Sequence, residues 1–386
     1  MKNRSMGRSF LTSSSIISPL GWNTGENFRN IIAGKTGIEI YENSPWSKEA
    51  VPLSVMKDGE VDERFSDLGS APAYTKLEKM ALLSMAEALE GSKVDPSSSS
   101  TVLIVSTTKG NVHLLDDEDN FDKQRVYLWN TADLLAGFFK MRNRPLLVCN
   151  ACISGVAAIL LGKRLISSGK FRNAIIVGMD ILSRFIVSGF QSFLSLSAEA
   201  CRPFDEDRSG LSLGEAAATV VLSEKESDIE ILSGSLSNDA NHISGPSRTG
   251  EGLFLSVSKT LEEIKAELGP EPSDWLDLIS AHGTATLYND EMESIALTRA
   301  GLNNVPVNSL KGNFGHTLGA AGLVESVINT EAMRRDEMPG TKGFSKLGVS
   351  RPLDVISNPR RAEVKIMLKL ASGFGGCNAS ILYRKN

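Results

Sequence analysis

Two cysteines three residues apart, in the stretch VCNACISGV (148–156), are the first residues whose spacing could do chemistry. Cys149 and Cys152 could form a redox dithiol, contribute half of a zinc site, or be one buried thiol followed by one reactive thiol. A redox dithiol needs both sulfurs near the surface, whereas Cys149 closes the apolar run PLLVC, which predicts a buried strand. Structural zinc needs four ligands, and the remaining cysteines, Cys201 and Cys377, stand alone far away. A reactive Cys152 therefore remains to be weighed.

Cys152 directly precedes ISGVAAILLGKRL, whose small residues would let a helix begin deep inside the protein. A thiol at a helix N-terminus feels the positive end of the helix dipole, which lowers its pKa and favours the thiolate. An inert buried cysteine is the alternative. This stretch alone leaves both open.

Two histidines favour the reactive alternative. His282, in LISAHGTATLYND, follows an apolar strand, and His316, in LKGNFGHTLGAAG, lies between a glycine and a helix rich in glycine and alanine. Either could be a core histidine with satisfied hydrogen bonds. Because both recur at strand-to-turn junctions, and a cysteine has a matching context, the three residues together indicate a catalytic site.

Short apolar strands alternate with helical patterns, which predicts an α/β architecture with largely buried sheets. We expect strands within 101–108, 173–182, 217–226 and 363–372, and helices within 74–91 and 256–269. Residues 144–169 run in the order strand, reactive residue, small residues, helix, and residues 305–335 repeat that order. The echo suggests two duplicated halves that meet near residues 225–230.

Bulk composition excludes several classes of protein. A net charge of −5 over 386 residues argues against a nucleic-acid binder, which needs a basic excess. Four cysteines without regular spacing make no disulfide framework, so we expect a cytoplasmic protein. No stretch approaches the roughly 20 apolar residues of a membrane span, and we expect no membrane association.

Motifs spread over nearly the whole chain resemble the β-ketoacyl-acyl-carrier-protein synthases of the elongating Cys–His–His type. The resemblance rests on seven stretches of this sequence: NIIAGKTGI (30–38), NACISG (150–155), RPFDEDRSGLSLGEAA (202–217), SNDANHISGP (237–246), HGTATLYND (282–290), LKGNFGHTLGAAG (310–322) and GFGGCNAS (373–380).

The resemblance implies a thiolase fold, in which duplicated βαβ halves form a five-layer α-β-α-β-α sandwich. It places the nucleophile in an N-terminal half, residues 1–226, and both histidines in a C-terminal half, residues 227–386. The implied activity is that of a 3-oxoacyl-acyl-carrier-protein synthase, an acyltransferase that condenses an enzyme-bound acyl chain with a malonyl thioester. The pathway would be fatty acid, polyene or polyketide biosynthesis.

Roles for individual residues follow from the same resemblance. Cys152 would accept the acyl chain, and His282 and His316 would hold the malonyl carbonyl and stabilise the enolate. Lys311 and Glu293 would form a buried pair that orients the histidines, because a lone buried ammonium is very costly.

The remaining implied residues bind substrate. The backbone N–H groups of Cys152 and Phe374 would form an oxyanion hole, with Phe374 as a gate. Other substrate-binding positions are Thr284, Thr286, Asp239, His242, Gly373, Gly375 and Gly376.

Partners and cofactors also follow from the resemblance. The substrates would be carried on the phosphopantetheine arm of an acidic acyl carrier protein, so we expect a basic patch near the pocket mouth; residues 140–144, 334–335 and 359–365 are candidates. We expect a homodimer, or a heterodimer with a chain-length-factor-like subunit, and no metal, nucleotide or flavin. A non-catalytic subunit of this kind is the alternative function, but such subunits lack the nucleophile. Ile153 and Ser372 depart from the family pattern and suggest a specialised substrate.

Overall fold

The computed structural model describes residues 7–116 and 121–386, and its strands occur in two sets with the same order. In the N-terminal set, the second strand pairs antiparallel with its neighbours on both sides, and the last three strands run parallel. The order is β1 (Phe10–Ile17), β8 (Ala216–Ser223), β6 (Asn173–Asp180), β4 (Thr101–Ser106) and β5 (Leu146–Val148).

The C-terminal set repeats this pattern of antiparallel and parallel pairs and adds one short strand at its edge. Its order is β9 (Ile229–Asn238), β16 (Cys377–Lys385), β15 (Ile366–Gly373), β10 (Leu278–Ser280), β11 (Pro306–Asn308) and β13 (Asp354–Val355). Among the described strands, β1 and β9 pair through two residue pairs and so join the two sets. The internal echo of the sequence is therefore a structural duplication.

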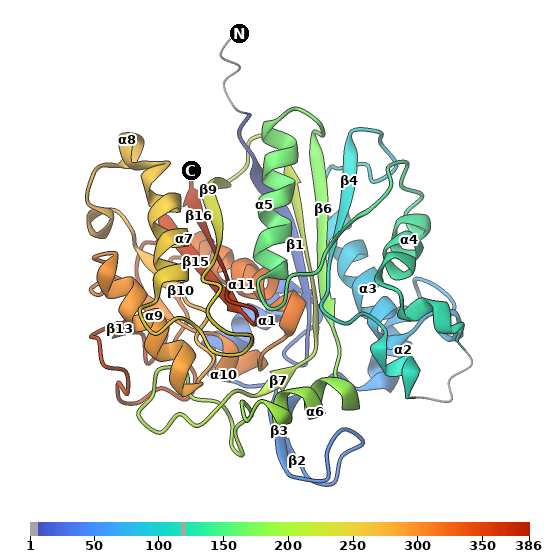
Figure 1. Cartoon of the computed structure of the whole chain (residues 1–386). Helices are drawn as coiled ribbons and strands as arrows, with labels where there is room; N and C mark the ends of the chain where they lie inside the picture. The colour runs from blue at the N-terminus through green and yellow to red at the C-terminus, as the bar shows by residue number, and fades with distance from the viewer. Residues whose placement is uncertain (1–6, 117–120) are drawn as a thin grey trace.

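Helices cover the two sheets in three layers, which gives a five-layer α-β-α-β-α sandwich (Figure 1). The middle layer consists of α5 (Ser154–Ser167) and α11 (Ala321–Arg335), both of which contact strands of the two sets. One outer layer contains α2 (Asp58–Phe65), α3 (Lys76–Glu90) and α4 (Leu128–Phe138), and the other contains α7 (Glu251–Glu262), α8 (Lys265–Leu268) and α9 (Leu287–Arg299). Other elements include α1 (Thr24–Ile32), β2 (Ile38–Tyr41), β3 (Val51–Ser54), α6 (Arg184–Ser192), β7 (Leu213–Gly214), α10 (Lys311–Phe314), β12 (Glu337–Met338) and β14 (Arg360–Arg361).

Strand residues alternate between two hydrophobic cores, because successive side chains point to opposite faces of a sheet. In β4, Val102 and Ile104 join the central core around α5 and α11, whereas Leu103 and Val105 join the outer core beneath α3 and α4. All four side chains are buried. This burial on both faces explains why the strand reads as a continuous apolar run.

The two middle helices meet at their N-terminal ends through glycines. A Cβ on Gly155 would lie 2.9 Å from the backbone nitrogen of Leu323, and a Cβ on Gly322 would lie 2.6 Å from that of Val156. Each is closer than real Cβ atoms approach backbone. The helices therefore touch backbone to backbone at the point where each chain segment enters its helix.

The predicted strands and the helix within 74–91 are confirmed, and Thr75 and Glu78 form a capping box at the start of α3. The helix expected within 256–269 begins earlier, at Glu251, and breaks into α7 and α8 near Ile264. None of the helices in the described ranges has the length and apolarity needed to cross a membrane.

Cys149 corrects one prediction, because it is exposed rather than buried. It follows β5, which lies at the edge of the sheet rather than inside it. An apolar run at a sheet edge reads like a buried strand in sequence, since its composition does not show whether a neighbour covers it.

Candidate active site

Cys152 lies in the tight turn between β5 and α5, two residues before the first residue of the helix. Ala151 has a φ of +44°, a strained conformation for a residue with a Cβ. Such strain is retained where the surrounding structure fixes it, and it often marks functional sites. The turn presents Cys152, which is buried, at the head of the middle helix layer.

Burial raises the pKa of the Cys152 thiol to about 11, although the charge of Lys311 and the backbone N–H of Phe374 act in the opposite direction. The prediction that helix position would favour a thiolate is therefore wrong for the free enzyme. Removal of the sulfur from water opposes ionisation more strongly than its surroundings favour it.

The three residues predicted to converge lie side by side. The sulfur of Cys152 and one ring nitrogen from each of His282 and His316 all lie within 4.8 Å of one another. The two imidazole rings are 5.3 Å apart between centroids and nearly perpendicular. Residues separated by up to 164 positions (316 − 152) thus form one cluster.

Neighbouring groups fix the tautomer of both histidines. The Nδ1 atom of His316 accepts a hydrogen bond from the backbone N–H of Leu318 at 3.3 Å, so the ring proton resides on Nε2. That Nε2 is buried and has no protein partner among the described residues. In His282, Nδ1 faces the Lys311 ammonium at 3.3 Å, which again places the proton on Nε2.

Burial also lowers the pKa of both histidines well below their ordinary value, and the positive charges of Lys311 and Lys369 lower it further. Each ring is therefore neutral at physiological pH and offers an Nε2–H donor. A pair of neutral donors in a dry site is suited to stabilise negative charge that develops on a carbonyl oxygen.

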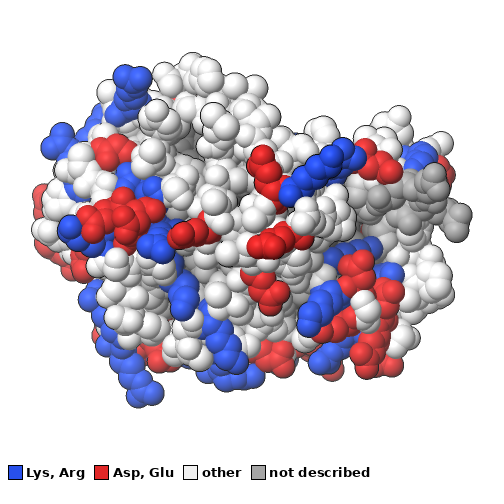
Figure 2. All heavy atoms as spheres, turned by 90° about the horizontal axis from the view of Figure 1, so that it is seen from below, with Lys and Arg blue, Asp and Glu red and all other residues white. Residues whose placement is uncertain are grey.

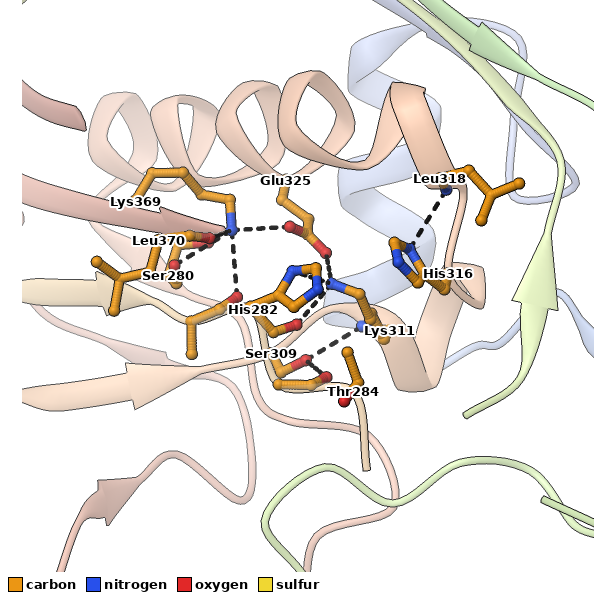
Figure 3. A network of polar contacts seen from close by, with 12 residues as sticks. Ser280, His282, Thr284, Ser309, Lys311, His316, Leu318, Glu325, Lys369 and Leu370 are labelled. Carbon is orange, nitrogen blue, oxygen red and sulfur yellow. Dashed lines mark hydrogen bonds and ion pairs between the residues drawn. The ribbon is translucent and has the colours of Figure 1, made fainter. Parts of the chain in front are cut away.

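Lys311 is buried as predicted, but its carboxylate partner is not Glu293. Its Nζ lies 2.6 Å from Glu325 on α11 and donates to the backbone carbonyl of His282 at 2.5 Å (Figure 3). Glu293 instead accepts hydrogen bonds from the backbone N–H groups of His282 at 2.7 Å and Gly283 at 2.6 Å.

Glu293 therefore shapes the backbone around His282 rather than neutralising the lysine. Burial and the nearby Asp290 raise the pKa of Glu293 to about 7. Asp290 serves the next two residues in the same way, accepting from the backbone N–H groups of Thr284 and Ala285. Both carboxylates project from α9 onto the loop that carries the histidine.

A second buried lysine, Lys369 on β15, was not anticipated from the sequence. Its Nζ lies 2.7 Å from the other oxygen of Glu325 and donates to the carbonyl of Ala281 at 3.2 Å (Figure 3). Burial lowers the pKa of Lys369, and Glu325 opposes this shift. One carboxylate thus bridges two lysines directly behind His282.

Phe374 lies over the site, packed against two phenylalanines of the α6 region. Its ring centroid is 5.5 Å from that of Phe190 and 5.1 Å from that of Phe193, and Phe190 also contacts His316. The preceding Gly373 lets the loop approach the nucleophile, because a Cβ there would lie 3.0 Å from the backbone nitrogen of Cys152. Phe374 thus lies beside Cys152, and its roles as gate and in an oxyanion hole stay predictions.

The other predicted loop, residues 237–246, lies against the glycine loop. The backbone N–H of Asp239 donates to Gly376 at 2.9 Å, and that of Gly375 donates to Ile243 at 2.7 Å. The Asp239 carboxylate fills the space where a Cβ on Gly376 would be, and Nδ1 of the exposed His242 accepts from the loop backbone. Two backbone hydrogen bonds therefore join the two loops.

A cavity of about 980 Å³ connects these groups to the surface. Cys152, both histidines and the predicted substrate residues Thr284 and Thr286 line it. The two threonine hydroxyls are 2.9 Å apart. Further lining residues from the prediction are Asp239, His242, Gly373, Phe374 and Gly376.

A buried carboxylate, Asp180 at the end of β6, links the two halves behind the site. It accepts hydrogen bonds from the backbone N–H of Gly319 at 2.7 Å and from the hydroxyls of Thr107 and Thr108. Because Gly319 follows His316 by three residues, Asp180 holds the histidine turn of one half against the strands of the other.

The sequence matches two family descriptions in succession: "Beta-ketoacyl synthase, N-terminal domain" over residues 10–228 and "Beta-ketoacyl synthase, C-terminal domain" over residues 229–345. The chain belongs to the beta-ketoacyl synthase family. The predicted resemblance is thereby confirmed, and the five-layer architecture is the thiolase fold of this family.

Several relatives of this beta-ketoacyl synthase are named 3-oxoacyl-acyl-carrier-protein synthases. A "3-oxoacyl-[acyl-carrier-protein] synthase 2" of Synechocystis sp. is 26% identical and covers 100% of both chains. Another of that name from Rhizobium meliloti is 33% identical over 64% of this chain and 62% of its own length. The fold is similar to that of a ketosynthase solved in complex with its chain length factor from Xenorhabdus doucetiae, with a TM-score of 0.86, 24% identity and full coverage of both chains.

Sequence reasoning missed Glu325 and Lys369, although both left a signal. Each is a charged residue inside an otherwise apolar or small stretch, AGLVESVIN and IMLKLAS. A charge in a segment that is buried all round must be paired. The basic patch expected near the pocket mouth stays a prediction. Among the described residues, those at 140–144, 334–335 and 359–365 do not line the cavity, whereas Arg248 does, and Arg299 and Arg351 line an adjoining pocket together with Arg248.

Proposed function

We propose that this beta-ketoacyl synthase joins an acyl chain held on Cys152 to a malonyl carrier-protein thioester, with loss of carbon dioxide. The observation that carries the proposal is the convergence of one sulfur and two neutral imidazoles, each with an Nε2–H donor, in one cavity. Its relatives named 3-oxoacyl-acyl-carrier-protein synthase support the same reaction class.

In the first half-reaction, the Cys152 sulfur attacks the carbonyl carbon of the incoming acyl thioester. The carrier thiol leaves with the proton that Cys152 loses, so the exchange of thioesters is balanced. The backbone N–H groups of Cys152 and Phe374 stabilise the negative oxygen of the tetrahedral intermediate. Because burial raises the pKa of the free thiol, we propose that Cys152 loses its proton during the attack.

In the second half-reaction, the malonyl thioester carbonyl lies against the Nε2–H donors of His282 and His316. Loss of carbon dioxide leaves an electron pair that forms an enolate, and both donors strengthen as negative charge develops. The enolate carbon then attacks the acyl carbonyl on Cys152, and the sulfur leaves as a thiolate. Lys311, Glu325 and Lys369 hold His282 and keep both rings neutral.

We propose that the reaction needs no metal or organic cofactor besides the carrier-bound substrates. Cys152, His282 and His316 are residue types that bind zinc, but two lysines behind them supply positive charge that disfavours a divalent cation.

A cytoplasmic location accords with the free cysteines.

A second condensing subunit, identical or of the chain-length-factor type, is proposed to pair along β5. This strand lies at an edge of the described sheet, and Leu147 on it is exposed. Open apolar edges invite pairing with another chain. The Xenorhabdus ketosynthase with its chain length factor is a precedent for the heterodimeric form.

The test is intact-protein mass spectrometry after incubation with a panel of acyl-carrier thioesters, followed by malonyl carrier protein. We expect one acyl adduct, mapped by peptide sequencing to Cys152, and its release as a 3-oxoacyl thioester on the carrier. A protein that forms no adduct with any chain length, yet binds a catalytic partner subunit, would instead be a non-catalytic chain-length-factor-like subunit.

A further inference from the structure

A second pocket, with a volume of about 680 Å³, adjoins the active-site cavity. Arg248, Arg299 and Arg351 line it, and we call it the arginine pocket. Arg248 and Thr249 also line the active-site cavity, so the two hollows meet at these residues. A ligand that occupies both would extend from Cys152 to the three guanidinium groups.

Arg299, the last residue of α9, is held in a fixed orientation. Its guanidinium group donates to the backbone carbonyl of Thr249 at 2.7 Å, pairs with Glu251 at 2.7 Å and lies 4.1 Å from the ring centroid of Phe254. Glu251, which also lines the arginine pocket, therefore neutralises one of the three positive charges. A guanidinium group fixed in this way is a surface on which a planar ring can stack.

The other two arginines have no partner of opposite charge. Among the described residues, neither Arg248 nor Arg351 makes an ion pair or a side-chain hydrogen bond. The backbone beside Arg351 is nevertheless fixed, because the N–H of Ser350 donates to Glu291 on α9 at 2.9 Å. The arginine pocket thus contains two guanidinium groups whose charge and donors are free to bind a ligand.

This concentration of positive charge contrasts with the protein as a whole. The chain carries a net charge of −5, and Figure 2, which views the side on which α6 lies, shows Lys and Arg interspersed with Asp and Glu. Unpaired like charges that lie together repel one another, and a bound anion relieves the repulsion. The arginine pocket therefore favours a ligand with several negative charges.

We infer that the arginine pocket binds the nucleotide end of coenzyme A, so that an acyl-coenzyme A thioester can load Cys152 directly. The inference rests on the proposed function. Coenzyme A carries a diphosphate next to its pantetheine arm and a further phosphate on its adenosine, so its anionic end emerges where the arm leaves the cavity. Arg248 and Arg351 bind the phosphates, whose oxygens match the fork of guanidinium donors, and Arg299 stacks against the adenine.

The size of the arginine pocket suits a nucleotide rather than the body of a protein, because its volume lies within the range of roughly 300–1,000 Å³ that is usual for small-molecule sites. The loading step is balanced. The Cys152 sulfur attacks the thioester carbonyl, the carbon–sulfur bond to coenzyme A breaks, and the coenzyme A thiol leaves with the proton that Cys152 loses.

The test measures binding and turnover separately. Calorimetry gives Kd for adenosine 3′,5′-bisphosphate and for inorganic phosphate, in wild type, Arg248→Gln, Arg351→Gln and the double variant. Kinetics gives KM for one acyl group carried on coenzyme A, on pantetheine and on the carrier protein. Arg164→Gln, which removes an exposed arginine in the last turn of α5, is the matched control. Circular dichroism verifies folding.

We expect wild type to bind the bisphosphate, and each pocket variant to weaken this binding roughly tenfold, with Arg164→Gln unchanged. In wild type, KM should be lower for the coenzyme A thioester than for the pantetheine thioester, and the double variant should abolish this difference. Raising NaCl from about 50 to about 500 mM should weaken binding of the bisphosphate, since salt screens exposed charges.

Absence of bisphosphate binding to wild type would overturn the inference, as would an affinity no greater than that for inorganic phosphate. A KM for the carrier thioester that rises as much as that for the coenzyme A thioester would also overturn it, because the arginines would then serve the carrier protein. If wild type binds the bisphosphate but turns over none of the three thioesters, the proposed function fails while the nucleotide site stands.

Discussion

The two halves of the molecule use the same strand-to-helix unit to present different catalytic side chains. In the N-terminal half, the turn after β5 presents Cys152 at the start of α5, and Asp180 is the nearby carboxylate. In the C-terminal half, the segment after β11 presents His316 before α11, with Lys311 and Lys369 behind it. Duplication supplied two equivalent positions, and the residues placed there have diverged.

The difference follows the two half-reactions. Acyl transfer needs a sulfur that is a good nucleophile during attack and a good leaving group afterwards, and the positive charge of Lys311 favours its thiolate form. Decarboxylation places negative charge on an oxygen, and preorganised donors backed by positive charge stabilise it. The comparison therefore predicts that loss of the N-terminal nucleophile stops acyl transfer but spares decarboxylation, whereas damage to the C-terminal unit slows decarboxylation and spares acyl transfer.

Cys152→Ala should give the largest effect. Without the sulfur no acyl-enzyme forms, and condensation is abolished, whereas malonyl decarboxylation persists because both histidines remain. Adduct mass and carbon dioxide release measure the two steps separately. Retained elongation would refute the assignment of the nucleophile.

The raised pKa of Cys152 predicts how its alkylation depends on pH. Because the pKa is about 11, the thiolate fraction rises tenfold per pH unit below that value, so the rate with iodoacetamide should rise roughly a thousandfold between pH 7 and pH 10. A Cys149→Ser background removes the exposed thiol. A rate that levels off near pH 8 would mean that the helix N-terminus prevails over burial after all.

His316→Ala should separate the half-reactions. Loss of one oxyanion donor typically costs roughly 10²- to 10³-fold in rate, so malonyl decarboxylation should fall by that factor while acylation of Cys152 changes far less. Carbon dioxide release and adduct mass again give the two readouts. Equal loss of both would mean that the two units are not functionally distinct.

Lys369→Met is expected to have a smaller effect, about a tenfold loss of decarboxylation, with a shift in pH dependence. Lys369 lowers the pKa of both His282 and His316, so its removal raises these pKa values. As the pH falls, the two rings therefore become protonated at a higher pH than in wild type. Activity should therefore fall at a higher pH on the acid side than in wild type. Lys163→Met, which removes a partly buried lysine of α5, is the control and should leave the acid limb in place.

The sequence allowed prediction of features encoded in short contiguous stretches. Apolar runs followed by small residues predicted that Cys152, His282 and His316 lie just after strand ends. The end of a strand fixes the position of the few residues that follow it. The partner of Lys311 was not predictable in this way. Glu293 and Glu325 are both buried glutamates close to Lys311 in the sequence. Only the packing of α9 and α11 determines that Glu293 accepts from the backbone, whereas Glu325 pairs with the ammonium group of Lys311.

The predictions of a buried Cys149 and of a lowered pKa for Cys152 were wrong for a related reason. Each depends on how much protein surrounds a group, and composition does not reveal whether a strand lies at an edge or how deep a helix begins.

The glycine contact between α5 and α11 has a consequence for how the reacting atoms are spaced. The backbones of the two helices are in contact at Gly155 and Gly322. This contact, rather than flexible loops, sets the distance between the thiol and the imidazoles. Substitutions in peripheral segments can therefore accumulate without changing this distance. A single methyl group added at either glycine would push the two helices apart. It would thereby separate the thiol from the imidazoles although no catalytic residue had been replaced.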